Sequence, residues 1–249
     1  MVKIRYTSWD GSQRVRLNAD QVFEKLSEYL SYTDDVQQAL EWLLRQGMEW
    51  EGMRIMGLDD LLDELREELR KLYRQFNLNN AFDDPRRRLE ELLDLERDAL
   101  ADSEPADAQQ RRDSLDRLPH RLSEAIEALK SYDFVDGDAR REFENLLEEL
   151  DNVRDLENFE RQYGDLFHGP ESPGYAEALD LMREMQRLKQ IEEELLSGDL
   201  ERIDLERLRE ILGQRAAQDF QTLREVMAML DRQGLEVERY ARHFRGEAP

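Results

Sequence analysis

The side chains that could bind a metal ion or transfer a proton are widely separated along this chain of 249 residues. The three histidines, His120, His168 and His243, occur in neither a His-Glu-x-x-His nor a Glu-x-x-His spacing, which would place ligands on one helical face. The sequence has no cysteine, which excludes disulfides, thiolate nucleophiles and thiolate metal ligands. We therefore expect no metal site and no bound cofactor.

Acidic residues are abundant, but their spacing does not indicate catalysis. Residues 133–138 (Asp-Phe-Val-Asp-Gly-Asp) superficially resemble a calcium loop, yet Val135 and Gly137 occupy positions that would have to carry oxygen ligands. Aspartates at the start of a helix explain this stretch better. Acidic runs such as 148–149 and 192–194 lie in helical segments with apolar opposite faces, so we expect them to point to water. Acid–base catalysis would need them in a dry cleft.

Composition narrows the function classes further. The chain has neither a phosphate-binding Gly-x-x-x-x-Gly-Lys loop nor a Gly-x-Gly-x-x-Gly turn, which argues against nucleotide binding. It carries 36 basic and 59 acidic residues, a net charge of −23 that repels nucleic acid and anionic membranes. This charge favours a basic partner, although solvated helix faces also explain it. Without a signal peptide or a run of about 20 apolar residues, we expect a cytoplasmic protein that is not an enzyme.

Helical periodicity dominates the sequence and predicts an all-α fold, an elongated multi-helix bundle with roughly 70% or more of its residues in helices. Asn18 is the expected N-cap of the first helix and Thr33 that of the second, which should end at Gly47. Residues 2–6 alternate apolar and basic side chains and form a short extended arm, the only strand that we predict.

Further helices are expected over residues 57–76, from 83 to about 101, over 118–132 and from 136 onwards. The helix over 57–76 has the clearest pattern, because its apolar residues recur at steps of three and four and form one stripe. Its members are Leu58, Leu61, Leu62, Leu65, Leu69, Leu72, Tyr73 and Phe76.

A segment with two prolines and two glycines, residues 168–174, interrupts the helices and predicts a boundary between domains. On this interpretation, residues 1–167 are an N-terminal helical bundle with its extended arm, and residues 175–249 are a long helix with a small C-terminal helical unit. The long helix, over about 175–196, has an apolar repeat close to 3.5 residues, the spacing of coiled coils. That repeat consists of Ala178, Met182, Met185, Leu188, Ile191 and Leu195.

The C-terminal helices, over 205–212 and 216–232, have the rhythm of a winged helix-turn-helix. An alternative function is therefore a transcriptional regulator that binds DNA through residues 205–240. The charge argues against it, because residues 199–245 carry ten acidic and nine basic residues and phosphate contacts dominate DNA affinity. A protein-binding unit of similar shape, or simple helices, fits this composition better.

Five stretches carry the most distinctive residue combinations: Tyr-Thr-Ser-Trp-Asp-Gly-Ser-Gln at 6–13, Ile-Met-Gly-Leu-Asp-Asp-Leu-Leu at 55–62, Phe-Asp-Asp at 82–84 with Asp-Leu-Glu-Arg at 94–97, Tyr-Asp-Phe at 132–134, and Tyr-Gly-Asp-Leu-Phe at 163–167. In this order they resemble the helical N-terminal region of bacterial proteins that end in a von Willebrand factor A (VWA) domain. The likeness covers much of residues 1–170 in patches and, more loosely, the helices to 235.

This resemblance implies a cytoplasmic, non-catalytic adaptor or scaffold that acts with a MoxR-type AAA+ ATPase in a chaperone-like or metal-insertion assembly. The expected partner is that ATPase or a VWA-domain subunit, and the sequence is also compatible with an oligomer. The VWA domain of such proteins binds Mg²⁺ through Asp-x-Ser-x-Ser. The nearest string here, residues 10–14, lacks the second serine, and no strand–helix alternation follows. The metal function therefore does not carry over.

Aromatic residues in or beside turns are the candidate protein-binding residues. We select Trp9, Asp10 and Gly11 in the N-terminal arm, together with Tyr163 and Phe167, because tryptophan and tyrosine are enriched at the energetic centres of interfaces. The simpler interpretation is that these aromatic side chains fill the ends of the bundle. The two interpretations differ in whether truncation weakens partner binding or stability.

Overall fold

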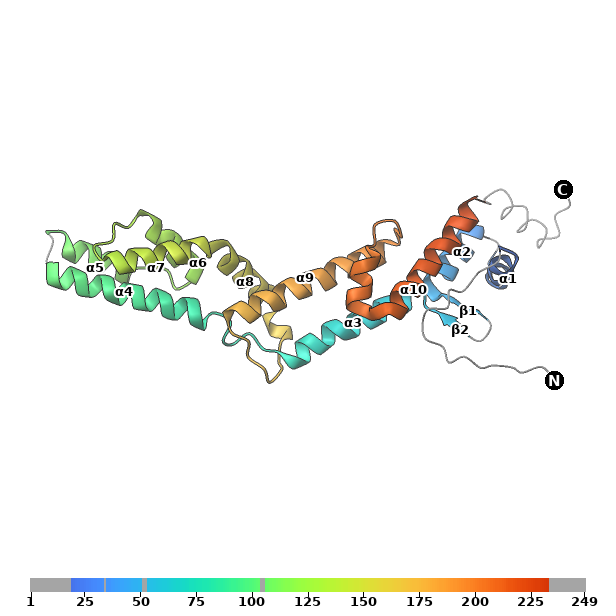
Figure 1. Cartoon of the computed structure of the whole chain (residues 1–249), viewed down its shortest axis with the longest axis horizontal. Coiled ribbons are helices and arrows are strands. Elements are labelled where there is room, and N and C mark those ends of the chain that lie inside the picture. Colours follow the sequence, from blue (N-terminus) through green and yellow to red (C-terminus); the bar gives the residue numbers. More distant parts are fainter. Residues whose placement is uncertain (1–18, 34, 51–52, 104–105, 233–249) are drawn as a thin grey trace, which may run out of the picture. The chain divides into compact units, whose positions relative to one another are not determined.

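The computed structural model describes residues 19–33, 35–50, 53–103 and 106–232 (Figure 1). These residues form ten α-helices, two short 3-10 helices and one antiparallel hairpin, which confirms the predicted all-α class. Among them, no helix has both the length and the apolar composition needed to cross a lipid bilayer. The predicted arm at 2–6 and the predicted cap Asn18 lie outside the described residues.

The chain forms two compact units, and the boundaries between them fall inside α3 and inside α9. Unit 1 combines residues up to 69 with those from 187 onwards, and unit 2 consists of residues 70–186. Unit 1 contains α1 (Ala19–Leu30), α2 (Val36–Gln46), β1 (Met48–Trp50), β2 (Met53–Ile55), the first part of α3 (Leu58–Gln75), the last part of α9 (Tyr175–Ser197) and α10 (Leu205–Arg232).

The core of unit 1 lies where α1, α2, the hairpin and α10 meet. Its buried members are Val22, Leu26, Ala39, Leu43, Met48, Ile55, Leu223, Val226 and Leu230. The N-cap of α2 is Asp35, whose carboxylate accepts hydrogen bonds from the backbone of Gln37 and Gln38. Our assignment of this cap to Thr33 is therefore wrong. Thr33 instead accepts a hydrogen bond from Asp35 N and donates one to the Gln38 side chain.

Gly47 ends α2 as predicted, in the left-handed region with a φ of 72°. The chain then enters a hairpin that the sequence analysis did not predict, with Met48 paired to Ile55 and Trp50 to Met53. The two C-terminal helices that we predicted are consecutive parts of α10, separated by Gly213, whose φ of 90° interrupts the helical backbone. A residue with a side chain would be strained there.

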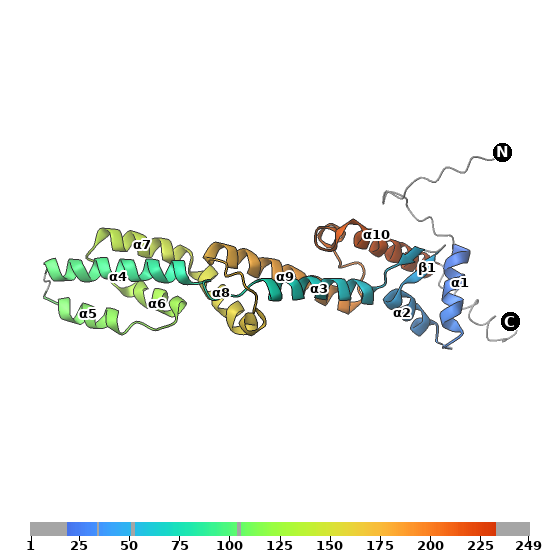
Figure 2. The same ribbon diagram turned by 90° about the horizontal axis from the view of Figure 1, so that it is seen from below.

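Unit 2 contains α4 (Asp83–Ser103), α5 (Ala108–Asp116), α6 (Leu122–Ala128), the 3-10 helix η1 (Leu129–Ser131), α7 (Gly137–Glu148), α8 (Leu150–Tyr163), the 3-10 helix η2 (Gly164–Leu166), and the adjoining parts of α3 and α9. Helices α4 and α7 lie side by side in both views (Figures 1 and 2). The helix predicted over 118–132 begins only at Leu122, because Pro119 disfavours helical backbone before it. The helix predicted from Asp136 is divided at Glu149 into α7 and α8.

The segment 168–174, which the sequence identified as a boundary, is not helical and lies within unit 2. It pairs with the end of α3, where Gly169 N donates to Phe76 O at 2.8 Å and Asn77 N donates to Glu171 O at 2.7 Å. The predicted apolar repeat of α9 is confirmed as a core face, since all six of its members are buried.

Candidate functional site

The five residues selected as protein-binding fall into two groups. Residues 9–11 lie outside the described part of the chain. Tyr163 and Phe167 belong to an aromatic cluster in unit 2, at the end of α8 and just after η2. Phe167 is only 6% exposed, whereas Tyr163 is half-buried. That these residues bind a partner stays a prediction, although the burial of Phe167 fits a core role.

The aromatic cluster is closely packed. The Phe167 ring meets Tyr73 edge-on with their centroids 5.0 Å apart, and it lies 5.7 Å from Phe159. Phe159 in turn lies 5.4 Å from the Tyr163 ring. His168, the next residue, donates its backbone N–H to Tyr73 O at 3.0 Å. These contacts attach the end of α8 to α3 within unit 2.

The acidic stretch 133–138 has a structural role, as expected. The Asp136 carboxylate accepts hydrogen bonds from Asp138 N at 2.8 Å and Ala139 N at 2.7 Å, which caps α7. The described residues include no group of three or more histidine, aspartate or glutamate side chains that could hold a metal ion. His168 Nδ1 lies 2.7 Å from its neighbour Leu166 O.

Two acidic runs each contain a carboxylate that is less exposed than the sequence indicated. Glu149 bonds Arg88 at 2.9 Å, and Glu192 bonds Arg66 at 3.0 Å with only 14% of its side chain exposed. Burial alone would raise the pKa of Glu192, but hydrogen bonds from Arg66 and Lys189 outweigh it, so the pKa is lowered. The expectation that these runs point to water is wrong for Glu149 and Glu192, which accept hydrogen bonds from arginines on facing helices, whereas Glu148 and Glu193 are exposed as expected.

Glu96 is a buried carboxylate that sequence reasoning did not select. It is 0% exposed and accepts hydrogen bonds from the Tyr132 hydroxyl, Val135 N and Asp136 N, each at 2.9 Å. Burial, followed by the bond to Glu96, raises the pKa of Tyr132. The motifs at 94–97 and 132–134, which carried part of the resemblance, are thus in direct contact. The only sequence signal was their joint occurrence in that resemblance.

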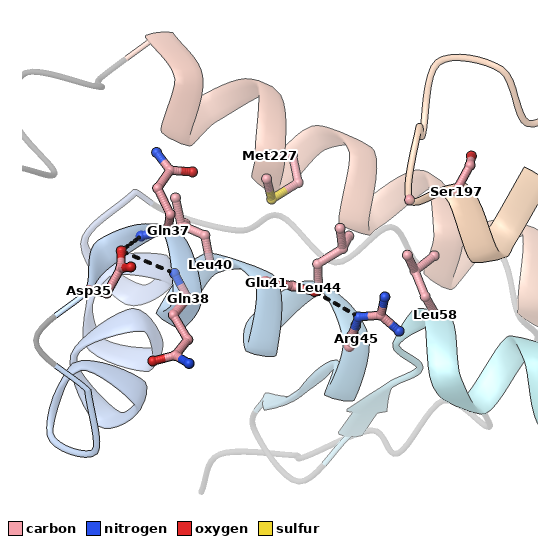
Figure 3. Close-up of a pocket in the computed structure, with 11 residues that line it drawn as sticks. Asp35, Gln37, Gln38, Leu40, Glu41, Leu44, Arg45, Leu58, Ser197 and Met227 are labelled. Carbon is pink, nitrogen blue, oxygen red and sulfur yellow. Dashed lines mark hydrogen bonds and ion pairs between the residues drawn. The ribbon is translucent and has the colours of Figure 1, made fainter.

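An open groove of about 580 Å³ lies on the described part of unit 1 (Figure 3). Four apolar side chains, from α2, α3 and α10, contribute to its lining, and the turn after α9 closes one part of it. The lining residues are Asp35, Gln37, Gln38, Leu40, Glu41, Leu44, Arg45, Leu58, Ser197, Gly198 and Met227.

Local structure fixes the polar part of this groove. Asp35 caps α2, and Gln37 and Gln38 in the first turn of that helix line the groove (Figure 3). Arg45 Nε donates to Glu41 at 3.1 Å, one helical turn earlier, and its guanidinium also lies 3.5 Å from the Asp59 carboxylate. Arg45, the one cation among the described residues that line the groove, therefore has two carboxylates close to it.

The apolar part of the groove is continuous with the core of unit 1. Leu40, Leu44 and Met227 are partly buried and pack against that core, and Leu58 is 2% exposed. Sequence spacing alone places Leu40 and Leu44 on one face of their helix. It could not show that the same face stays partly open, because part of its surroundings comes from the distant ends of α9 and α10.

A helical domain is also what sequence comparison finds in this chain. Residues 79–149, which span α4 to α7 and the start of the turn into α8, match the family model described as "Mb0984 helical domain". The fold of that stretch is built around the contact of α4 with α7 and the Glu96 hydrogen bonds.

Two curated mycobacterial proteins share part of the sequence. The uncharacterized protein Mb0984 of Mycobacterium bovis and the uncharacterized protein Rv0959 of Mycobacterium tuberculosis are each 32% identical over 108 residues, 43% of this chain. The match covers 16% of the length of each relative. No solved structure matches significantly.

Proposed function

We propose that this chain is a non-catalytic helical adaptor that binds a protein partner through the groove beside α2. The observation that carries the proposal is the groove itself, which combines partly buried leucines with an exposed polar margin on the same helix. Protein interfaces commonly have this arrangement, an apolar centre with a polar rim.

The partner that we propose is a MoxR-type AAA+ ATPase or a VWA-domain subunit, within a chaperone-like or metal-insertion assembly in the cytoplasm. The resemblance at 55–62, 94–97, 132–134 and 163–167 supports this choice. The match to the Mb0984 helical domain supports the helical nature of residues 79–149 and does not bear on the partner. The match covers 16% of the length of the curated relatives, so the activity of those whole proteins is not part of this proposal.

The test is a binding measurement between purified chain and the MoxR-type ATPase encoded by the same organism. Isothermal titration calorimetry with and without ATP should give a saturable complex, and ATPase turnover should change when the chain is added. A second titration uses the VWA-domain protein from that organism. Absence of binding to both proteins would reject the partner assignment.

DNA binding through residues 205–240 receives less support. Arg224 lies 3.6 Å from Glu201, and Arg215 lies 3.9 Å from Asp219, so these two cations of α10 face carboxylates. A salt-titrated DNA-binding assay separates the two functions, because phosphate contacts give a steep fall of affinity with salt.

A further inference from the structure

We infer that the groove beside α2 seats a basic amphipathic helix of the partner protein. This inference rests on the proposed protein-binding function and adds the chemistry of the segment that binds. It is based on three properties of unit 1, namely the shape of the groove, the charge around it and the exposed hydrophobic residues next to its lining.

The shape favours a helix over a small molecule. The groove is open to solvent and runs beside α2, with Gln37 and Gln38 at the start of that helix and Arg45 near its end (Figure 3). Leu40 and Leu44 are four residues apart and therefore lie on one face of α2. An amphipathic helix laid into such a groove inserts residues at the same three- and four-residue steps.

The charge selects a basic partner. Asp35 and Glu41 both line the groove, and the Glu41 side chain is 61% exposed. The groove cation, Arg45, is already close to Glu41 and Asp59. Residues 19–69, which include α2 and the start of α3, carry fourteen acidic and four basic residues, and residues 187–232, which supply Ser197, Gly198 and Met227, carry eleven acidic and eight basic residues. Complementary charge speeds association and disfavours partners of like charge, so lysines and arginines on the polar face of the incoming helix would be attracted.

Two exposed hydrophobic residues lie close in sequence to residues that line the groove. Tyr32 is 80% exposed and lies three positions before Asp35, while Leu196 is 47% exposed and immediately precedes Ser197. They adjoin segments that line the groove from α2 and from the end of α9. Tyrosine is frequent at the energetic centres of interfaces, so contact with Tyr32 would strengthen binding.

The test uses three labelled peptides of about 18 residues, five helical turns. The first is a helix with leucines at steps of three and four and lysines on the other face. The second has the same leucines with glutamates in place of the lysines, and the third has the composition of the first in an order without an apolar face. Fluorescence anisotropy with the full chain should show saturable binding of the first peptide, at least about tenfold tighter than of the other two.

Two matched pairs of variants locate the site. Glu41→Lys should weaken binding of the first peptide about tenfold, whereas Glu144→Lys should not. Glu144 is the control because it is also an exposed member of an i,i+4 arginine pair, 59% exposed against 61% for Glu41. Ser197→Trp should block the groove, whereas Ser131→Trp should not. Each of these exposed serines donates its hydroxyl to the carbonyl three residues earlier.

The outcomes are distinguishable from those of the proposed function. Equal binding of the basic and acidic peptides, equal binding of the scrambled peptide, or equal loss in both members of a variant pair would overturn the inference. So would a complex with the ATPase that Glu41→Lys and Ser197→Trp leave intact. Groove-dependent binding of the basic helix without any binding of the ATPase or the VWA protein would uphold the inference and reject the partner assignment.

Discussion

Gly47 and Gly57 lie backbone to backbone, with no room for a side chain on either. A Cβ on Gly47 would come 2.5 Å from Gly57 N, and a Cβ on Gly57 would collide with the backbone of Arg45 and Gly47. The hairpin β1–β2 connects the two glycines and returns the chain, so that α3 starts beside the end of α2. Because both helices line the groove, this contact helps to define its geometry.

Gly57→Ala should therefore destabilise the protein, whereas Gly137→Ala should not. A Cβ on Gly57 overlaps backbone atoms, which cannot move aside as a flexible side chain can, so we expect a loss of more than about 1 kcal/mol. A Cβ on Gly137 would have no other heavy atom within 4 Å, and this residue begins α7, so alanine there should be neutral or stabilising by about 0.4–1 kcal/mol. Urea denaturation measures the free energy of unfolding of both variants. Equal changes in the two would contradict the close contact of Gly47 and Gly57.

Replacing Glu96 by glutamine should destabilise unit 2. Glu96 accepts from one hydroxyl and two backbone N–H groups, and an amide NH₂ in place of one oxygen would face a donor without an acceptor. Leaving a buried polar group unsatisfied costs about 1–3 kcal/mol. Glu90→Gln, on the exposed face of the same helix, is the control and should leave the denaturation midpoint unchanged. Similar denaturation midpoints for the two variants would contradict a structural role for Glu96.

Arg88 should matter more than its neighbour Arg87. Arg88 joins α4 to Glu142 at 2.6 Å and to Glu149 at 2.9 Å, and only 19% of its side chain is exposed. Arg88→Ala should cost about 1–3 kcal/mol, because it leaves two partly buried carboxylates without their partner. Arg87 is 59% exposed, and its ion pairs among the described residues are with Asp84 and Glu91 of the same helix. The melting temperature of Arg87→Ala should match that of the unsubstituted protein. A fall in melting temperature comparable to that of Arg88→Ala would contradict the larger role of Arg88.

Asp219 should make unit 1 less stable as pH rises. Burial raises the pKa of its carboxyl above the ordinary value, despite a hydrogen bond from Met56 N at 3.2 Å. The folded state therefore holds this proton more tightly than the unfolded state, and its contribution to stability is lost as pH rises through the folded pKa. Asp219→Asn keeps an oxygen for Met56 N and does not ionise. Stability measured from below the ordinary aspartate pKa to neutrality should fall less steeply in the variant, and parallel curves would refute the prediction.

Local patterns were sufficient for most helices but not for their caps and breaks. The apolar stripes of α3 and α9 specify a face by spacing alone, and the structure buries that face throughout α9 and over the first five members of the α3 stripe. Thr33 and Asp35 are both good caps, so a choice two residues apart depends on backbone geometry that sequence does not show. The hairpin at 48–55 depends on the close approach of Gly47 and Gly57, a contact between segments and not a local preference.

The candidate site was less accessible to sequence reasoning, for a different reason. The groove needs residues of α2 and α3 to meet Ser197, Gly198 and Met227, and no short-range pattern encodes such distant contacts. The carboxylates of Glu149 and Glu192 were misjudged for the same reason, because their arginine partners lie on other helices. Aromatic residues beside turns drew attention to Tyr163 and Phe167, but that signal does not distinguish an exposed anchor from a core residue.

The segment 163–167 offers a direct test between those two roles, because adjacent residues differ in exposure. Phe167 is 6% exposed and packs on Tyr73 and Phe159, whereas Leu166 is 45% exposed. Phe167→Ala should cost about 3–5 kcal/mol, since it removes a buried ring and leaves a cavity. Leu166→Ala should change stability by less than about 0.5 kcal/mol.

Partner affinity completes this test. If the segment binds the ATPase or the VWA protein, Leu166→Ala should weaken the complex although the melting temperature is unchanged, because Leu166 is the apolar side chain that the segment presents to solvent. Trp9→Ala, measured in parallel, should likewise weaken the complex if Trp9 is an anchor. Loss of stability in Phe167→Ala with unaltered affinity in Leu166→Ala would leave Phe167 as a core residue of unit 2 and remove residues 163–167 from the binding surface. The groove beside α2 would then be the better supported binding surface, because its polar margin is exposed in the folded protein.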